Sequence, residues 1–210
     1  MNEATVFVVD DDAAVRAGIA LLLETAGLRH ECHASGEDFL AAWHPLRFGC
    51  VLLDLRMQGM DGIATQEELT RRGSHMPVIF LSAFGDVPTT VRAMRGGALD
   101  FMTKPVDGGQ LVSRVFQALR TSEQDRNVAA AVARYRAGVA SLTERERSVL
   151  ALAITGSANK AIADQLGISS RTVEVHRAHI VLKLGIGSVM ELHTHGESLG
   201  VTVHELLGLG

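Results

Sequence analysis

Thr5–Asp12 has the sequence TVFVVDDD, in which five β-branched or aromatic residues are followed directly by three aspartates. An apolar run of this kind predicts a buried β-strand. The apolar residues of Ala13–Thr25 then recur with helical spacing, and Gly27 marks the end of that helix. The same order of strand and helix recurs until about residue 120. The further strands are expected at Leu28–His33, Cys50–Leu53, Pro77–Leu81 and Leu99–Thr103, and the further helices at Gly36–Trp43, Asp61–Arg72, Asp86–Arg95 and Asp107–Leu119. These units predict an α/β doubly wound fold, a (βα)5 parallel sheet with helices on both faces.

The composition is that of a folded protein with one large or two small domains. The chain has 210 residues, of which 47% are hydrophobic and 21% charged, and this excludes a disordered chain. No apolar run reaches the roughly 18 residues of a membrane span, and the first residues lack the basic segment of a signal peptide. We therefore expect a cytoplasmic protein without membrane partners. Cys32 and Cys50 lie in or beside predicted strands, and we expect both thiols to be buried.

The second half of the chain has a different pattern. Residues 121–140 are rich in Ala and Arg and predict a helical linker that continues the preceding helix, with a flexible tether as the alternative. Beyond Leu142 the strand pattern is gone, and helices are expected at Thr143–Thr155, Asn159–Leu166 and Ser170–Leu184. The predicted organisation is therefore an α/β domain over residues 1–120, the linker over 121–140 and an all-α domain over 141–210.

Residues with useful chemistry follow four of the predicted strands. In an open parallel sheet the carboxyl ends of the strands meet at one edge, where ligands bind. Several carboxylates gathered there repel one another and need a cation, and carboxylate and carbonyl oxygens suit Mg²⁺. A lysine and a hydroxyl beside the metal would hold a phosphoryl group. The residues concerned are Asp10, Asp11, Asp12, Asp54, Ser82 and Lys104. The alternative is that the aspartates merely cap helices and end strands.

With these residues in place, the first 120 residues resemble the CheY-like receiver domain of two-component response regulators. The matching motifs are Val8-Val9-Asp10-Asp11-Asp12, Leu52-Leu53-Asp54-Leu55-Arg56-Met57, Gly59-Met60-Asp61-Gly62, Leu81-Ser82-Ala83 and Asp100-Phe101-Met102-Thr103-Lys104-Pro105. The resemblance implies that Asp54 is the phosphoacceptor. It also implies Mg²⁺ ligands in Asp11, Asp54 and the Arg56 backbone carbonyl, with Asp10 acting through water, and phosphoryl-binding or switch roles for Ser82, Lys104 and Phe101. Lys104-Pro105 would be a cis peptide.

Two positions depart from the receiver pattern. Gln58 stands where the family usually has Pro, and Gly96-Gly97 stands where one Gly is usual. We expect neither to touch the chemistry, although either could alter how the switch is transmitted. A haloacid-dehalogenase-type phosphatase is the enzymatic alternative, because Asp10 and Asp12 have its spacing. The phosphatase pattern, however, has Thr at the position that Ala14 occupies here, and it has no role for Asp54.

The three helices of the second half have the order and connections of a helix-turn-helix. Thr143 and Glu146 have the spacing of a capping box. On a helical wheel of residues 170–184, one set of apolar residues faces inward and another set is free to meet a DNA groove. The inward set is Val173, Ile180 and Leu184, and the outward set is Arg171, Glu174, Val175 and Ala178. Leu182 also lies toward the front, where we expect the tail helix to cover it.

This half resembles the LuxR/NarL-type helix-turn-helix, and both halves together suit the FixJ-like subgroup. The matching residues are Leu142-Thr143-Glu144-Arg145-Glu146, Asn159-Lys160-Ala161-Ile162-Ala163, Leu166-Gly167-Ile168-Ser169, Arg171 to Arg177 and Lys183-Leu184. The resemblance implies DNA contacts from Asn159, Lys160, Arg171, Thr172, Glu174, Val175, His176, Arg177, Ala178 and Lys183. The tail after Gly185 departs from the pattern, although a fourth helix is expected near Ser188. Low basic content keeps a protein-docking module open as the alternative.

The sequence therefore predicts a two-component response regulator. A sensor histidine kinase would phosphorylate Asp54, and the protein would then form a homodimer through its fourth helix and fifth strand, bind promoter DNA and regulate transcription. RNA polymerase is a further candidate partner. The chain would not be an enzyme beyond slow Mg²⁺-dependent autophosphorylation from small donors and autodephosphorylation.

Overall fold

The computed structural model describes residues 4–83, 87–189 and 191, and it contains a parallel sheet of five strands. The strands are β1 (Thr5–Val9), β2 (His30–His33), β3 (Gly49–Asp54), β4 (Val78–Ser82) and β5 (Asp100–Thr103). Their order in the sheet is β2-β1-β3-β4-β5, with every neighbouring pair parallel. The predicted doubly wound fold is confirmed, and its strand order reverses between β1 and β3.

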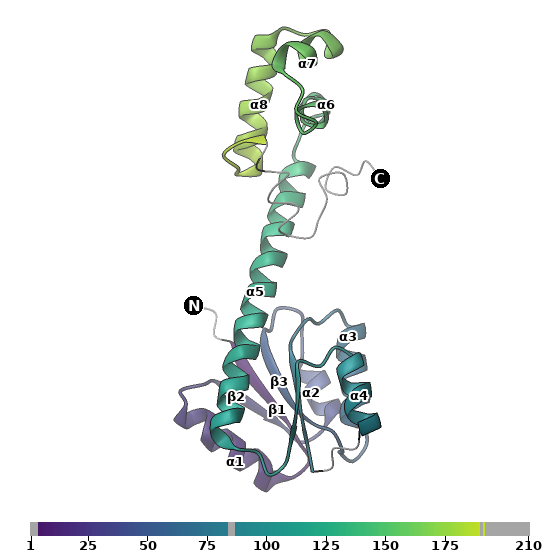
Figure 1. The fold of residues 1–210 in the computed structure, drawn as a ribbon, viewed down its shortest axis with the longest axis vertical. Helices are drawn as coiled ribbons and strands as arrows, with labels where there is room; N and C mark the ends of the chain where they lie inside the picture. The colour runs from purple at the N-terminus through teal and green to yellow at the C-terminus, as the bar shows by residue number, and fades with distance from the viewer. Residues whose placement is uncertain (1–3, 84–86, 190, 192–210) are drawn as a thin grey trace. The chain divides into compact units, whose positions relative to one another are not determined.

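Helices cover both faces of the sheet (Figure 1). They are α1 (Ala13–Thr25), α2 (Gly36–Ala42), α3 (Gly62–Arg71), α4 (Val87–Arg95) and α5 (Gly108–Ala140). Because successive strand residues point to opposite faces, Val6 and Val8 join the core beneath α1 and α5, whereas Phe7 and Val9 join the core beneath α2, α3 and α4. Two apolar cores thus hold the central strands rigid, and the strand ends stay free for polar residues.

One expectation about the cysteines is wrong. Cys50 lies in the central strand β3 and is buried, and this burial raises the pKa of its thiol to about 12. Cys32, in contrast, is exposed. It lies on β2, which is an edge strand and pairs only with β1. A strand at the sheet edge has fewer neighbours to cover it, and the sequence pattern alone does not reveal which strand takes that position.

The chain divides into two compact units, residues 1–126 and 127–210. Helix α5 belongs to both, because it runs without interruption from Gly108 to Ala140 and includes the predicted linker, residues 121–140. The exact boundaries at residues 120 and 140 stay a prediction. Within the part of the chain that the structure describes, no helix is both long and apolar enough to span a membrane.

The second unit contains α6 (Glu144–Ala153), α7 (Asn159–Leu166) and α8 (Ser170–Leu184), as the sequence predicts. The capping box of Thr143 and Glu146 is present at the start of α6. Gly167 ends α7 in the left-handed conformation, at φ 66°, which glycine adopts without strain. Ser169 then caps α8 through the Thr172 N–H. The expected fourth helix near Ser188 falls mostly outside the described residues.

Candidate functional site

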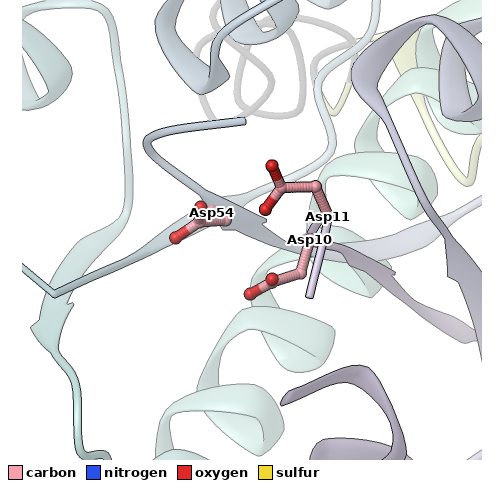
Figure 2. A group of neighbouring side chains, drawn as sticks. All are labelled: Asp10, Asp11 and Asp54. Carbon is pink, nitrogen blue, oxygen red and sulfur yellow. The ribbon is translucent and has the colours of Figure 1, made fainter. Parts of the chain in front are cut away.

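Three carboxylates meet where the strand order reverses. Asp10 follows β1 and Asp54 ends β3, and the pairing of Val9 with Leu53 places their backbones side by side. Asp10 and Asp54 are buried, whereas Asp11 is exposed. One carboxylate oxygen from each of the three lies within 4.8 Å of the others, and Figure 2 shows the three side chains grouped together. Oxygen donors at this spacing fit a hard divalent cation such as Mg²⁺.

Lys104 joins two of these carboxylates. Its Nζ atom donates to Asp10 Oδ2 at 2.6 Å and to Asp54 Oδ1 at 2.8 Å. The residue follows β5 and precedes a cis peptide to Pro105, as predicted. Its backbone N–H donates to the carbonyl of Ser82, the buried last residue of β4, at 2.7 Å. Four strand ends therefore converge on one polar site.

The site carries more negative than positive charge. Burial raises the pKa of Asp54, and the charges of Asp10 and Asp11 act in the same direction against the opposing effect of Lys104. Burial alone would lower the pKa of Lys104, but its hydrogen bonds to Asp10 and Asp54 outweigh this effect and raise it. Lys104 thus stays charged beside the carboxylates. One ammonium among three carboxylates leaves a negative site that favours a bound cation.

Phe101 and Arg56 lie on two different segments near the acidic edge of the sheet, β5 and the loop after β3. Phe101 lies in β5, is half-buried and packs against the apolar core beneath α2, α3 and α4. Arg56 lies in the loop between β3 and α3, two residues beyond Asp54. Their roles in switching and metal binding stay predictions.

Sequence reasoning misses two contacts around this loop. The backbone N–H of Gln58 donates to Asp11 Oδ2 at 3.1 Å, and the backbone N–H of Met60 donates to Glu37 Oε1 at 2.8 Å. The expectation that Gln58 does not touch the chemistry stays a prediction, but its backbone N–H contacts Asp11, a candidate metal ligand. The available signal was the missing proline, since only a residue other than proline has an N–H at position 58.

Helix α8 has a buried apolar side and an exposed side opposite to it. Val173, Ile180 and Leu184 are buried in the core of the second unit, as the helical wheel predicts. The residues of the predicted front are exposed, namely Arg171, Glu174, Val175 and Ala178. Leu182 is 80% exposed. An exposed front on a fixed back is the arrangement that a major-groove helix needs.

Several predicted DNA-contacting residues also contact one another. Arg171 Nη1 lies 3.2 Å from Glu174 Oε2, one helical turn away. Arg177 Nη1 donates to Asn159 Oδ1 at 3.0 Å and so joins α8 to the start of α7. Thr172 and His176 are half-buried beside them, and Lys160 is exposed in the first turn of α7. The helix-turn-helix therefore holds its own polar residues in a defined arrangement.

Lys183 is engaged within the helical unit. Its Nζ atom donates to Glu146 Oε2 at 2.7 Å and to the Ser141 carbonyl at 3.2 Å. Burial alone would raise the pKa of Glu146, but hydrogen bonds from Lys183 and Thr143 lower it to about 2. The structure thus assigns Lys183 a contact between α8 and α6, and its contact with a DNA phosphate stays a prediction. The capping box was the only sequence signal for Glu146.

Comparison with known proteins establishes the class. The model of the response regulator receiver domain matches residues 6–116, and that of the bacterial regulatory proteins of the luxR family matches residues 140–195. The chain belongs to the response regulators that join a receiver domain to a LuxR-type DNA-binding domain, and it is a transcriptional regulator of the FixJ/NarL type. A receiver implies a histidine kinase partner, and a LuxR-type domain implies DNA.

Individual relatives resemble nearly the whole chain. The transcriptional regulatory protein FixJ of Azorhizobium caulinodans is 46% identical over 190 residues, which cover 89% of each chain. Nodulation protein W of Bradyrhizobium diazoefficiens is 35% identical over 97% of this chain and 89% of its own. Among solved structures, the response regulator StyR superposes with a TM-score of 0.84 at 41% identity and covers 93% of this chain and 99% of its own.

Proposed function

We propose that a sensor histidine kinase phosphorylates Asp54 in the presence of Mg²⁺, and that the phosphorylated protein dimerises and binds promoter DNA to regulate transcription. The observation that carries this proposal is the pair of hydrogen bonds from Lys104 to Asp10 and Asp54. They hold a permanent positive charge against the carboxylate that would receive the phosphoryl group.

The site residues have distinct roles in this reaction. An oxygen of Asp54 attacks the phosphorus of the phosphohistidine, the P–N bond breaks and the histidine leaves. Lys104 pairs with the phosphoryl oxygens and Ser82 donates its hydroxyl to one of them. Asp11, Asp54 and the Arg56 carbonyl would hold Mg²⁺, with Asp10 acting through water. When bound, Mg²⁺ would supply positive charge beside the phosphoryl oxygens. Slow autophosphorylation from small donors and slow hydrolysis of the aspartyl phosphate use the same atoms.

A labelling experiment tests this assignment. The full chain is incubated with acetyl phosphate, with and without EDTA, and resolved on a phosphate-affinity gel. Wild type should shift only when Mg²⁺ is present, and Asp54→Asn should not shift. Asp12→Asn is the matched control, because asparagine keeps the helix cap of Asp12 while one negative charge beside the site is lost. Equal labelling of Asp54→Asn and wild type would refute the assignment.

Dimerisation through α4 and β5 is supported by an apolar stripe. Val87, Val91 and Met94 are spaced at i, i+4 and i+7 on α4 and are 74%, 42% and 45% exposed. Residues at this spacing share one helix face. Phosphorylation shifts the receiver from its inactive to its dimerising state. The size of the shift equals the difference in the free energy with which the two states bind the phosphoryl group. Sedimentation with beryllofluoride as the phosphoryl mimic should show more dimer, and an unchanged monomer fraction at every concentration would contradict this part of the proposal.

DNA binding is assigned to α8 and the start of α7. Glu174 accepts from a cytosine amino group and Val175 contacts a thymine methyl, while Ala178 lets the helix approach the groove. The DNA phosphates are contacted by residues that set the register, namely Asn159, Lys160, Arg171, Thr172, His176, Arg177 and Lys183.

The receiver comprises residues 1–120, the linker 121–140 and the DNA-binding domain 141–210. The protein acts in the cytoplasm, where RNA polymerase is a candidate partner at the promoter. Mobility shift against genomic fragments, with and without beryllofluoride, tests this part.

A further inference from the structure

The loop between β3 and α3 is held by a backbone N–H at position 58, where the receiver family usually has a proline. Gln58 is exposed, yet its backbone N–H donates to Asp11 Oδ2 at 3.1 Å. Proline at this position would have no N–H to offer. A carboxylate has two oxygens, so Asp11 can accept from Gln58 with one and still ligate a cation with the other. The hydrogen bond therefore restricts the orientation of a candidate ligand.

A second contact anchors the same loop to the first turn of α2. Glu37, in the first turn of α2, accepts the Met60 N–H with Oε1 at 2.8 Å. Gly59 makes room for this carboxylate, because a Cβ there would lie 2.7 Å from Glu37 Oε1 and the residue has φ +80°. Backbone hydrogen bonds from Glu37 itself and from Met60 lower the pKa of the Glu37 carboxyl. A charged acceptor therefore faces the loop.

Both contacts lie a few residues beyond Arg56, the one loop residue with a proposed metal role. Arg56, whose carbonyl is a proposed ligand, lies between Asp54 and Gln58. The end of the loop is closed by a hydrogen bond from the Gly62 N–H to the Leu55 carbonyl at 3.0 Å. With anchors at Asp11 and Glu37, the loop retains little freedom to move the Arg56 carbonyl away from the carboxylates.

We propose that Gln58 and Glu37 are positioning residues for the cation site: the Gln58 N–H orients the Asp11 carboxylate, and Glu37 holds the loop that carries the Arg56 carbonyl. This inference rests on the proposed Mg²⁺ site. Groups that hydrogen-bond to metal ligands fix the ligand geometry before the metal binds, and their loss typically weakens metal binding by about tenfold or more.

Two pairs of variants of the full chain test the inference by calorimetric titration with Mg²⁺. Gln58→Pro removes the N–H and Gln58→Ala keeps it. Glu37→Ala removes the acceptor and Glu37→Gln keeps one. Gln58→Ala and Glu37→Gln should bind Mg²⁺ like wild type. Gln58→Pro should bind about tenfold more weakly, and Glu37→Ala should also bind more weakly but by a smaller factor, because Glu37 contacts the loop and not a ligand. Equal affinity within each pair would overturn the inference.

Amide hydrogen exchange of the metal-free wild type gives an independent readout, even if Gln58→Pro does not fold. Gln58 is exposed and Met60 is half-buried, and the hydrogen bonds of their amides to Asp11 and Glu37 would slow their exchange. Both should be protected, and Glu37→Ala should remove the protection of Met60 alone. Fast exchange of both amides in wild type would overturn the inference. The failure of the underlying site looks different, because wild type and Asp54→Asn would then both fail to bind Mg²⁺.

Discussion

Replacing Lys104 with methionine removes the one ammonium that the structure places between Asp10 and Asp54. Methionine keeps most of the length and apolar volume of the lysine side chain but cannot donate. The two carboxylates are 1% and 6% exposed, so both would remain buried without their charged partner. We expect the receiver to lose stability in the absence of metal and to recover part of it when Mg²⁺ is added.

The size of the effect follows from burial. Removing one partner of a buried ion pair costs about 3–5 kcal/mol. The Lys104 side chain is 19% exposed, so water screens part of the interaction and the lower end, about 3 kcal/mol, is expected. For a domain of this size, that corresponds to a melting temperature lower by roughly 12 °C. Asp54→Asn added to Lys104→Met should recover part of the loss, because it removes one unpaired carboxylate.

Trp43 provides the assay. It is the only tryptophan of the chain and packs against the core of the first unit, so its fluorescence reports on receiver unfolding. Urea unfolding is followed in EDTA and in millimolar Mg²⁺. Arg92→Met is the matched control, because Arg92 pairs with Glu67 at the surface, with both side chains more than half exposed. Such pairs contribute under about 1 kcal/mol. A Lys104→Met protein as stable as Arg92→Met in EDTA would refute the reasoning.

Three further predictions concern the other surfaces. Met94→Glu places a charge in the exposed stripe of α4 and should leave the beryllofluoride-treated protein monomeric in sedimentation. Arg95→Glu, in the same last turn, controls for the added negative charge. A Met94→Glu protein that dimerises as strongly as wild type would contradict the α4 interface. Glu174→Ala or Val175→Ala should relax base preference at one or two positions per half-site, each at a cost of about 1–3 kcal/mol of binding free energy. Lys160→Ala should weaken binding to matched and scrambled DNA sites alike and lower the salt slope by about one per protomer. Unchanged affinity and base preference in both Glu174→Ala and Val175→Ala would show that α8 does not read bases. The lowered pKa of Glu146, about 2, means that its contribution to the stability of the helical unit is complete above its ordinary pKa of about 4.3 and is lost as the pH falls toward 2. Far-UV circular dichroism across this window, with Glu146→Gln as the variant, should show a flatter pH dependence for the variant, and parallel curves would argue against the assignment.

Much of the fold could be predicted because its signals are local. The apolar run of β1, the helical spacing of α1 and the caps at Asp12, Ser35 and Thr143 lie within a few residues of the structure they specify. The boundaries agree closely, with β2 starting at His30 rather than Leu28 and α6 ending at Ala153 rather than Thr155. The acidic site was also predictable, since parallel strands bring their carboxyl ends to one edge.

The features that the sequence pattern missed depend on contacts between distant segments. Cys32 is exposed on β2, which lies at the sheet edge, and the strand order depends on pairing between segments far apart in the sequence. The family resemblance implies a DNA contact for Lys183, but it does not reveal that Glu146, 37 residues earlier, receives its ammonium. In the same way, 47 residues separate Gln58 from Asp11 and 23 separate Met60 from Glu37.

The sequence by itself determined which segments become strands and helices and which chemical groups follow the strands, because these properties follow from residue type and short-range periodicity. Only the tertiary structure decided which of those groups touch. Lys104 reaches Asp10 and Asp54 across β4, and Asp11 meets the Gln58 N–H, because the sheet order β1-β3-β4-β5 brings the ends of separate strands within hydrogen-bonding distance. Hydrogen bonds depend on differences of a few tenths of an ångström, and that precision arises from the packed core beneath the site.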